Sequence, residues 1–178
     1  MSKKNDFIFK ALNVMSWIIF IGLCVEAGAL IFNFGFTLFK PVATHNVYKG
    51  LDLAELYENQ FNHYLGIMSF AIVLSLLKAY LFYLVVNIFE KLNLVKPFSQ
   101  EIAKLIEKIS FEAFAIAIVS VVANQYTHRL IEFGYKVSHI EAYWADIASF
   151  LMMAAIVFVI SQIFNKGLEI QNENDLTV

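Results

Sequence analysis

Four long apolar runs, separated by short charged segments, make up most of this 178-residue chain. A bilayer core about 30 Å thick needs about 20 residues of apolar α-helix to cross it. The pattern predicts membrane spans over about 14–36, 64–89, 109–130 and 146–165. We therefore expect an all-α integral membrane protein, a four-helix bundle that forms a single domain over residues 1–178.

The third run gives the least regular pattern of the four. Its strictly apolar part is Ala113–Ala123, bounded by Glu112 on one side and by Asn124 and Gln125 on the other. A span at this position requires these polar side chains to face protein rather than lipid. A three-span chain is therefore an alternative that the sequence leaves open.

The first run also resembles a secretory signal, because lysines precede it and Ala27-Gly28-Ala29 looks like a small-residue cleavage site. Glu26 stands directly before that site, and the chain stays apolar after it. Both observations favour an uncleaved first span.

Basic residues are distributed unevenly between the predicted connections. The N-terminal segment, the second connection and the tail hold eight lysines, whereas the first and third connections hold Lys40, Lys49, Arg129 and Lys136. Short cytoplasmic segments carry the excess of Lys and Arg in membrane proteins. We therefore expect both termini to lie in the cytoplasm.

The second connection contains its own helix signal. Ser99 follows Pro97 and can cap a helix in which Ile102, Ile106 and Ile109 share one face. This pattern predicts an amphipathic helix over about 99–109, between the second and third spans, that lies along the cytoplasmic membrane interface and runs into the third span.

Composition excludes several functional classes. The chain is 60% hydrophobic and 16% charged, whereas a soluble domain has about 25% charged residues. Its net charge of −2 provides no basic surface for nucleic acid, so no direct nucleic-acid partner is expected. No nucleophile elbow, phosphate loop or His-Glu metal helix is present in the sequence. We therefore expect no enzyme, no catalytic residue and no cofactor.

Two ionisable residues stand alone inside long apolar runs, Glu26 in the first and Lys78 in the second. Each costs about 2.5–3.5 kcal/mol at the bilayer centre on insertion scales, so each calls for a partner. Both fall about 16–21 Å below the outer boundary, at 1.5 Å per residue. We predict an intramembrane polar pair that fixes helix order, with an ion- or proton-responsive switch as the alternative.

Other polar residues predict helix packing rather than chemistry. Ala113, Ala117, Ser120 and Asn124 recur at helical spacing, so small residues would allow close approach and Asn124 would bond across the contact. Gln162 in the fourth span is a second polar packing candidate. The four histidines all fall on the outer side and lack the spacing of a zinc motif, so no metal site is expected: His45, His63, His128 and His139.

Two short segments carry a family resemblance. They are Lys96-Pro97-Phe98-Ser99 before the amphipathic helix, and the ending from Phe164-Asn165-Lys166-Gly167-Leu168-Glu169 to Asn174-Asp175-Leu176-Thr177-Val178. With the span order, they resemble the bacterial four-span membrane proteins known as domain of unknown function 2975. Many members have Asn-Pro-Phe where this chain has Lys96-Pro97-Phe98. The resemblance implies the bacterial cytoplasmic (inner) membrane and a small helix-turn-helix regulator as partner, and it brings no established activity.

Two functions follow as hypotheses. The first is a regulatory or sensory membrane protein that acts through a cytoplasmic partner such as that regulator, using the 99–109 helix and the acidic tail Glu169–Asp175. The alternative is a small transporter or permeation protein that uses Glu26 and Lys78. Because four helices leave little room for a pore, the alternative requires a homo-oligomer.

Overall fold

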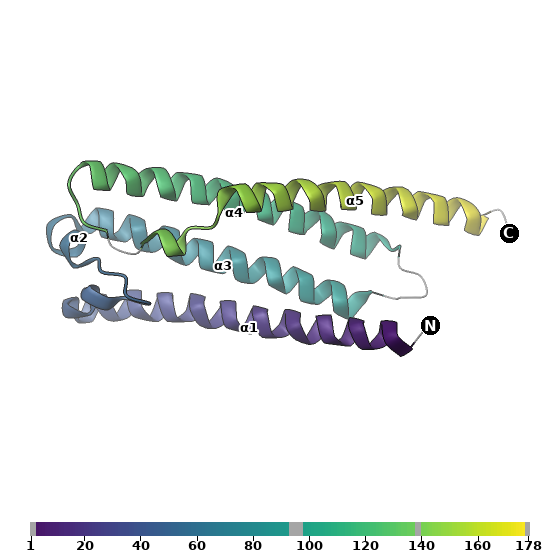
Figure 1. The fold of residues 1–178 in the computed structure, drawn as a ribbon, viewed down its shortest axis with the longest axis horizontal. Helices are drawn as coiled ribbons and strands as arrows, with labels where there is room; N and C mark the ends of the chain where they lie inside the picture. Colours follow the sequence, from purple (N-terminus) through teal and green to yellow (C-terminus); the bar gives the residue numbers. More distant parts are fainter. Residues whose placement is uncertain (1–2, 93–97, 138–139, 177–178) are drawn as a thin grey trace.

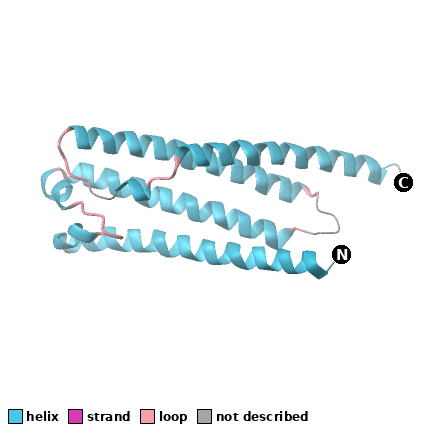
Figure 2. Ribbon diagram, viewed as in Figure 1, coloured by secondary structure: helices cyan, strands magenta, loops and turns pink. Residues whose placement is uncertain are grey.

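The computed structural model describes residues 3–92, 98–137 and 140–176. All regular elements in these ranges are helical, which confirms the all-α class (Figures 1 and 2). In chain order they are α1 (Lys3–Phe39), η1 (Pro41–Asn46), α2 (Ala54–Asn59), α3 (Phe61–Lys91), α4 (Gln100–Glu132), η2 (Ile140–Tyr143) and α5 (Ile147–Leu176). Lys96 and Pro97 of the predicted turn, His139, and the last two residues of the tail lie outside the described residues.

Three of the described helices are long and apolar enough to cross a membrane. They are Phe7–Phe39 within α1, Phe61–Lys91, which is α3, and Ile147–Glu173 within α5. At 1.5 Å per residue each is about 40–50 Å long, against a hydrocarbon core of about 30 Å. They correspond to the first, second and fourth predicted spans, and their length and composition are those of a membrane protein.

Helix α4 joins two segments that the sequence analysis treated separately. Its start agrees with the prediction, because the Ser99 hydroxyl accepts a hydrogen bond from the Ile102 amide at 3.3 Å. The helix then runs without interruption to Glu132. The segment predicted as a helix over 99–109 therefore continues into the third predicted span without a break. The physical reason is that α4 contains neither Gly nor Pro, and the buried stripe that begins at Ile102 continues in phase to Ala113.

The long helices pack in series, with α1 against α3, α3 against α4 and α4 against α5. Small residues permit the close contacts of α4, since Ala113, Ala117 and Ser120 are fully buried. Ser110 adds a polar contact by donating a hydrogen bond to the Ala154 carbonyl of α5 at 3.0 Å. The two ends of this series, α1 and α5, are therefore held by different neighbours.

The chain ends lie together at one end of the molecule, opposite α2 and the connection between α4 and α5 (Figure 1). The connections at that opposite end fold back along the helices rather than away from them. Leu51, Leu53 and Leu56 of the first connection are fully buried, in a cluster that includes Tyr64 of α3 and Ile140 of η2. Because these leucines are buried, the polar groups of the two connections are held close to the long helices.

Candidate functional site

The tip of the first connection is a tight turn over residues 48–51. Lys49 and Gly50 both have positive φ, 49° and 81°, and the Leu51 amide bonds the Tyr48 carbonyl at 3.1 Å. Positive φ at both central residues is the signature of a type I′ turn, which reverses the chain in two residues. Burial of Leu51 anchors the turn, so the Lys49 side chain is directed toward the helices.

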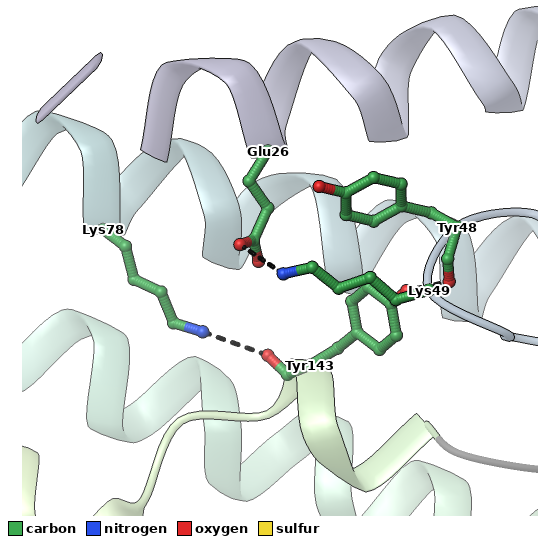
Figure 3. A network of polar contacts seen from close by, with 5 residues as sticks. All are labelled: Glu26, Tyr48, Lys49, Lys78 and Tyr143. Atoms are coloured by element: carbon green, nitrogen blue, oxygen red, sulfur yellow. Dashed lines mark hydrogen bonds and ion pairs between the residues drawn. The ribbon is translucent and has the colours of Figure 1, made fainter. Parts of the chain in front are cut away.

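Glu26 of α1 accepts a hydrogen bond and ion pair from Lys49, with Nζ and Oε2 3.0 Å apart (Figure 3). The Glu26 side chain is 26% exposed and that of Lys49 is 59% exposed. The hydrogen bond with Glu26 raises the pKa of Lys49 above its usual value of 10.5, because the ammonium is the form that donates. Lys49 is therefore charged at neutral pH.

Lys78 of α3 uses a different acceptor. Its ammonium donates to the backbone carbonyl of Tyr143 in η2 at 3.1 Å (Figure 3). The Tyr143 hydroxyl in turn donates to the Tyr48 carbonyl, which joins the two connections. Burial raises the pKa of Tyr143 to about 12, so its hydroxyl keeps the proton that it donates.

The predicted direct pair between Glu26 and Lys78 requires correction. No ion pair within 4 Å joins them among the described residues, although both side chains face the same polar network (Figure 3). Because the connections fold back along the helices, Lys49 lies next to Glu26, and the Tyr143 carbonyl lies next to Lys78. Among the described side chains, the network holds two lysines, Lys49 and Lys78, and one carboxylate, Glu26.

Next to Lys78 lies an apolar cavity of about 710 Å³. All four long helices contribute to it: Ile19 and Leu23 from α1, Val85 from α3, Ile106 from α4, Val157 and Ile160 from α5. Among the described residues that line it, Lys78 is the only charged one. Ligand sites are typically about 300–1,000 Å³, mostly apolar, with few polar groups that fix orientation. The cavity and the Lys78 ammonium together form the candidate site.

A family model described as a protein of unknown function (DUF2975) matches residues 48–178. The chain belongs to this family. No curated protein and no solved structure matches the chain. The DUF2975 segment includes Lys49, Lys78 and Tyr143 of the polar network, while Glu26 and the rest of α1 precede it.

The two predicted packing residues of the DUF2975 segment both lie at its surface. Asn124 is exposed and borders an open groove at the start of α5, and Gln162 of α5 is exposed as well. Neither bridges helices as predicted. The helical phase explains this result, since the buried positions of α4 next to Asn124 are Ser120, Ala123 and Thr127.

Sequence reasoning missed two polar contacts that α4 makes with other parts of the DUF2975 segment. One is the bond from Ser110 to α5, and another is the Trp144 indole, which donates to the Thr127 hydroxyl at 3.3 Å. Their signal was the position of Ser110 and Thr127 on the apolar stripe of α4. A polar residue on such a stripe is expected to find a partner.

Two of the histidines that the structure describes, His45 and His63, have side-chain partners. His45 lies 3.5 Å from the Asp52 carboxylate, and His63 Nδ1 lies 2.7 Å from the Tyr126 hydroxyl. Across the described residues, no three His, Cys, Asp or Glu side chains are grouped closely enough to hold a metal ion. The histidines therefore add no second candidate site to this DUF2975 protein.

Proposed function

We propose that the protein crosses the bacterial cytoplasmic membrane four times, with both termini in the cytoplasm, and acts there as a sensor of apolar molecules. The common position of the two chain ends supports an even number of crossings (Figure 1). The uneven distribution of lysines supports the orientation, since in the sequence the N-terminal segment, the second connection and the tail hold eight of them.

Helix α4 supplies the fourth crossing in this proposal. Its outward face is charged at Lys104 and Lys108, apolar from Phe111 to Val122, and polar again from Gln125. From Lys108 to Gln125 the helix rises about 25 Å, close to the thickness of the hydrocarbon core. Lysines at the end of such a band can extend their ammonium groups toward the interface.

Cysteine labelling in intact cells tests the four crossings. In a Cys24→Ser background, single cysteines replace Lys104, Phe114 and Gln125, which are all exposed on α4. A membrane-impermeant maleimide should label position 125 from outside, position 104 only after permeabilisation, and position 114 in neither case. Rapid labelling of position 114 would place α4 in water and leave three spans.

The sensory role is carried by one observation, the cavity that all four long helices line. On one side of the cavity α1 packs against α3, and on the other side α5 packs against α4. A molecule in the cavity therefore contacts two helices, α1 and α5, that pack against different neighbours. Occupancy therefore changes the relation between α1 and α5 with little disturbance of the α3–α4 contact. A ligand shifts such an equilibrium only through its different affinity for the two arrangements.

The C-terminal end of α5 is proposed to contact the cytoplasmic partner. This helix extends beyond the other helices at the end where both termini lie (Figure 1). After Lys166 it contains Glu169, Glu173 and Asp175 and no basic residue. An acidic helix end suits a basic partner surface, and the helix-turn-helix regulator implied by the resemblance is the proposed partner.

Co-purification of the full chain with that regulator tests the role. Val157→Phe fills the cavity, whereas Val159→Phe adds the same ring to the exposed face of the same helix. Filling the cavity should change the amount of regulator captured, and Val159→Phe should not. Removal of residues 168–178 should abolish capture. Equal capture by all of these variants would reject the sensory role.

The transport alternative receives less support from this geometry. Ion paths are lined by carbonyl oxygens, charged rings or water-filled surfaces. The lining of the cavity is apolar apart from Lys78, and Glu26 is engaged by Lys49.

A further inference from the structure

We infer that the cavity binds a single-chain amphiphile with a carboxylate head, a long-chain fatty acid, with the carboxylate at Lys78 and the chain directed toward the end where the termini lie. This inference rests on the proposed function, which requires only that some apolar molecule occupies the cavity. It adds the chemical class and the orientation of the occupant.

The length of the cavity fits one acyl chain. Its lining on α3 runs from Lys78 to Ile88 and its lining on α5 from Phe150 to Ile160, ten residues in each case. Both helices run in the same direction (Figure 1). At 1.5 Å per residue the cavity extends about 15 Å, which is half of a hydrocarbon core of about 30 Å. One leaflet of lipid chains has this thickness.

The charge of the site fits one acidic group. Glu26 and Lys49 form an ion pair, and within the described part of the chain no carboxylate lies within 4 Å of the Lys78 ammonium. Among these residues, Lys78 therefore has no carboxylate partner of its own at the end of the apolar cavity. An ammonium group has three donors, and Tyr143 accepts from one of them. A carboxylate can accept from the others and neutralise the site.

The position of the charge favours a free fatty acid over a phospholipid. Lys78 lies near the middle of α3, seventeen residues from Phe61 and thirteen from Lys91. The phosphate of a bilayer phospholipid stays at the surface, so its chains would meet Lys78 with a methyl end. Only an acid whose head is small enough to be enclosed brings its charge to this depth.

The experiment uses the full chain in phosphatidylcholine nanodiscs and a palmitate that carries a photoreactive diazirine near its methyl end. Adducts mapped by mass spectrometry are expected on the lining far from Lys78, at Ile88, Ile106 or Ile160. Unlabelled palmitate should compete strongly, and hexadecanol and phosphatidylglycerol should compete at least about tenfold more weakly.

Four variants separate the contributions of charge and cavity. Lys78→Gln should weaken palmitate binding about tenfold or more and leave hexadecanol binding unchanged, whereas Lys78→Arg should retain palmitate. Val157→Phe should weaken both ligands, and Val159→Phe neither. Thermal unfolding of each variant shows whether it folds. If Lys78→Gln does not fold, the comparison of palmitate with hexadecanol on the wild-type protein still tests whether the site recognises a carboxylate.

The outcomes separate this inference from the proposed function. If palmitate and hexadecanol compete equally, or Lys78→Gln retains palmitate, the carboxylate assignment is overturned and an apolar ligand site remains. If phosphatidylglycerol competes as well as palmitate, the occupant is a phospholipid and the inference fails. If neither amphiphile protects the cavity from labelling, both the inference and the proposed ligand site fail.

Discussion

The polar network makes a quantitative prediction about which residues are energetically coupled. Glu26 contacts Lys49 directly at 3.0 Å, whereas Lys78 contacts the Tyr143 carbonyl. The test is a pair of double-mutant cycles with Glu26→Gln, Lys49→Met and Lys78→Met. Each cycle isolates a pairwise interaction free energy from the costs of the single changes.

The expected magnitudes follow from contact and exposure. Because Lys49 is 59% exposed, its pair with Glu26 should show a coupling free energy of about 0.5–1 kcal/mol, the range of partly exposed ion pairs. The coupling of Glu26 with Lys78 should be about half of that or less, since no direct contact exists and Coulomb energy falls with distance. Glu26→Gln alone should destabilise by about 1–2 kcal/mol, because it leaves two lysines facing each other.

Lys78→Met should be nearly neutral for stability. It removes a charge from an apolar environment, which is favourable by about 2.5–3.5 kcal/mol on insertion scales. It also loses a charged hydrogen bond to the Tyr143 carbonyl, which is worth about 1.5–3 kcal/mol. These opposing effects are similar in size.

Reversible unfolding in mixed micelles at pH 7 measures these values. The raised pKa of Lys49 means that its contribution is fully present below the usual 10.5 and is lost as the pH rises through the higher folded value. Neutral pH therefore measures the intact pair. A third double-mutant cycle on the exposed pair of Lys91 and Glu101, whose Nζ and Oε1 atoms are 2.6 Å apart, serves as the control. A coupling between Glu26 and Lys78 larger than that between Glu26 and Lys49 would contradict the structure and restore the direct pair.

Three further predictions concern the packing of the helices and the start of α5. Gly66→Ala should destabilise by about 1–3 kcal/mol, since its Cβ would lie 2.8 Å from the Tyr126 hydroxyl, and added Tyr126→Phe should recover part of this loss in thermal unfolding. Ser110→Ala should cost about 0.5–1.5 kcal/mol in the same assay, because a carbonyl of α5 loses its donor. Ser149 lowers the pKa of Asp146 below 3.8 by hydrogen bonding, so this carboxylate stabilises the fold above that value and the contribution disappears as the pH falls through the folded value. Ser149→Ala should therefore move this loss to higher pH in an acid titration of stability; an unchanged titration would show that the hydrogen bond has no effect.

Sequence alone predicted the long helices because lipid imposes a simple requirement. A run such as 64–89 must be helical if it crosses a bilayer, whatever its neighbours. The amphipathic character of 99–109 was interpreted as an interfacial position at the start of the third span. An amphipathic stripe also fits a helix that packs on other helices, and the continuous stripe from Ile102 to Ala113 decides between them.

The site was predictable only in part, for a related reason. Glu26 and Lys78 were identified because isolated charges stand out in apolar runs. Lys49 gave the weaker signal of a lysine before Gly50, which is compatible with a turn of any orientation. Tyr143 contributes a backbone carbonyl, and no side-chain pattern reveals which carbonyl will accept a hydrogen bond. The direction in which a connection folds depends on packing between distant segments.

The folded-back connections explain how this chain tolerates charges within long apolar helices. A carboxylate and an ammonium group at the same depth would neutralise each other if they paired directly, and the resulting site would have little affinity for an anion. Instead, the Glu26 carboxylate pairs with Lys49, which belongs to a connection and not to a long helix. Lys78 donates to the Tyr143 carbonyl, an uncharged acceptor that does not neutralise an ammonium group. The consequence is a positive group beside an apolar cavity. A structural pair would need no cavity, and a cavity for neutral lipid would need no lysine, so their combination favours an acidic amphiphile as the ligand.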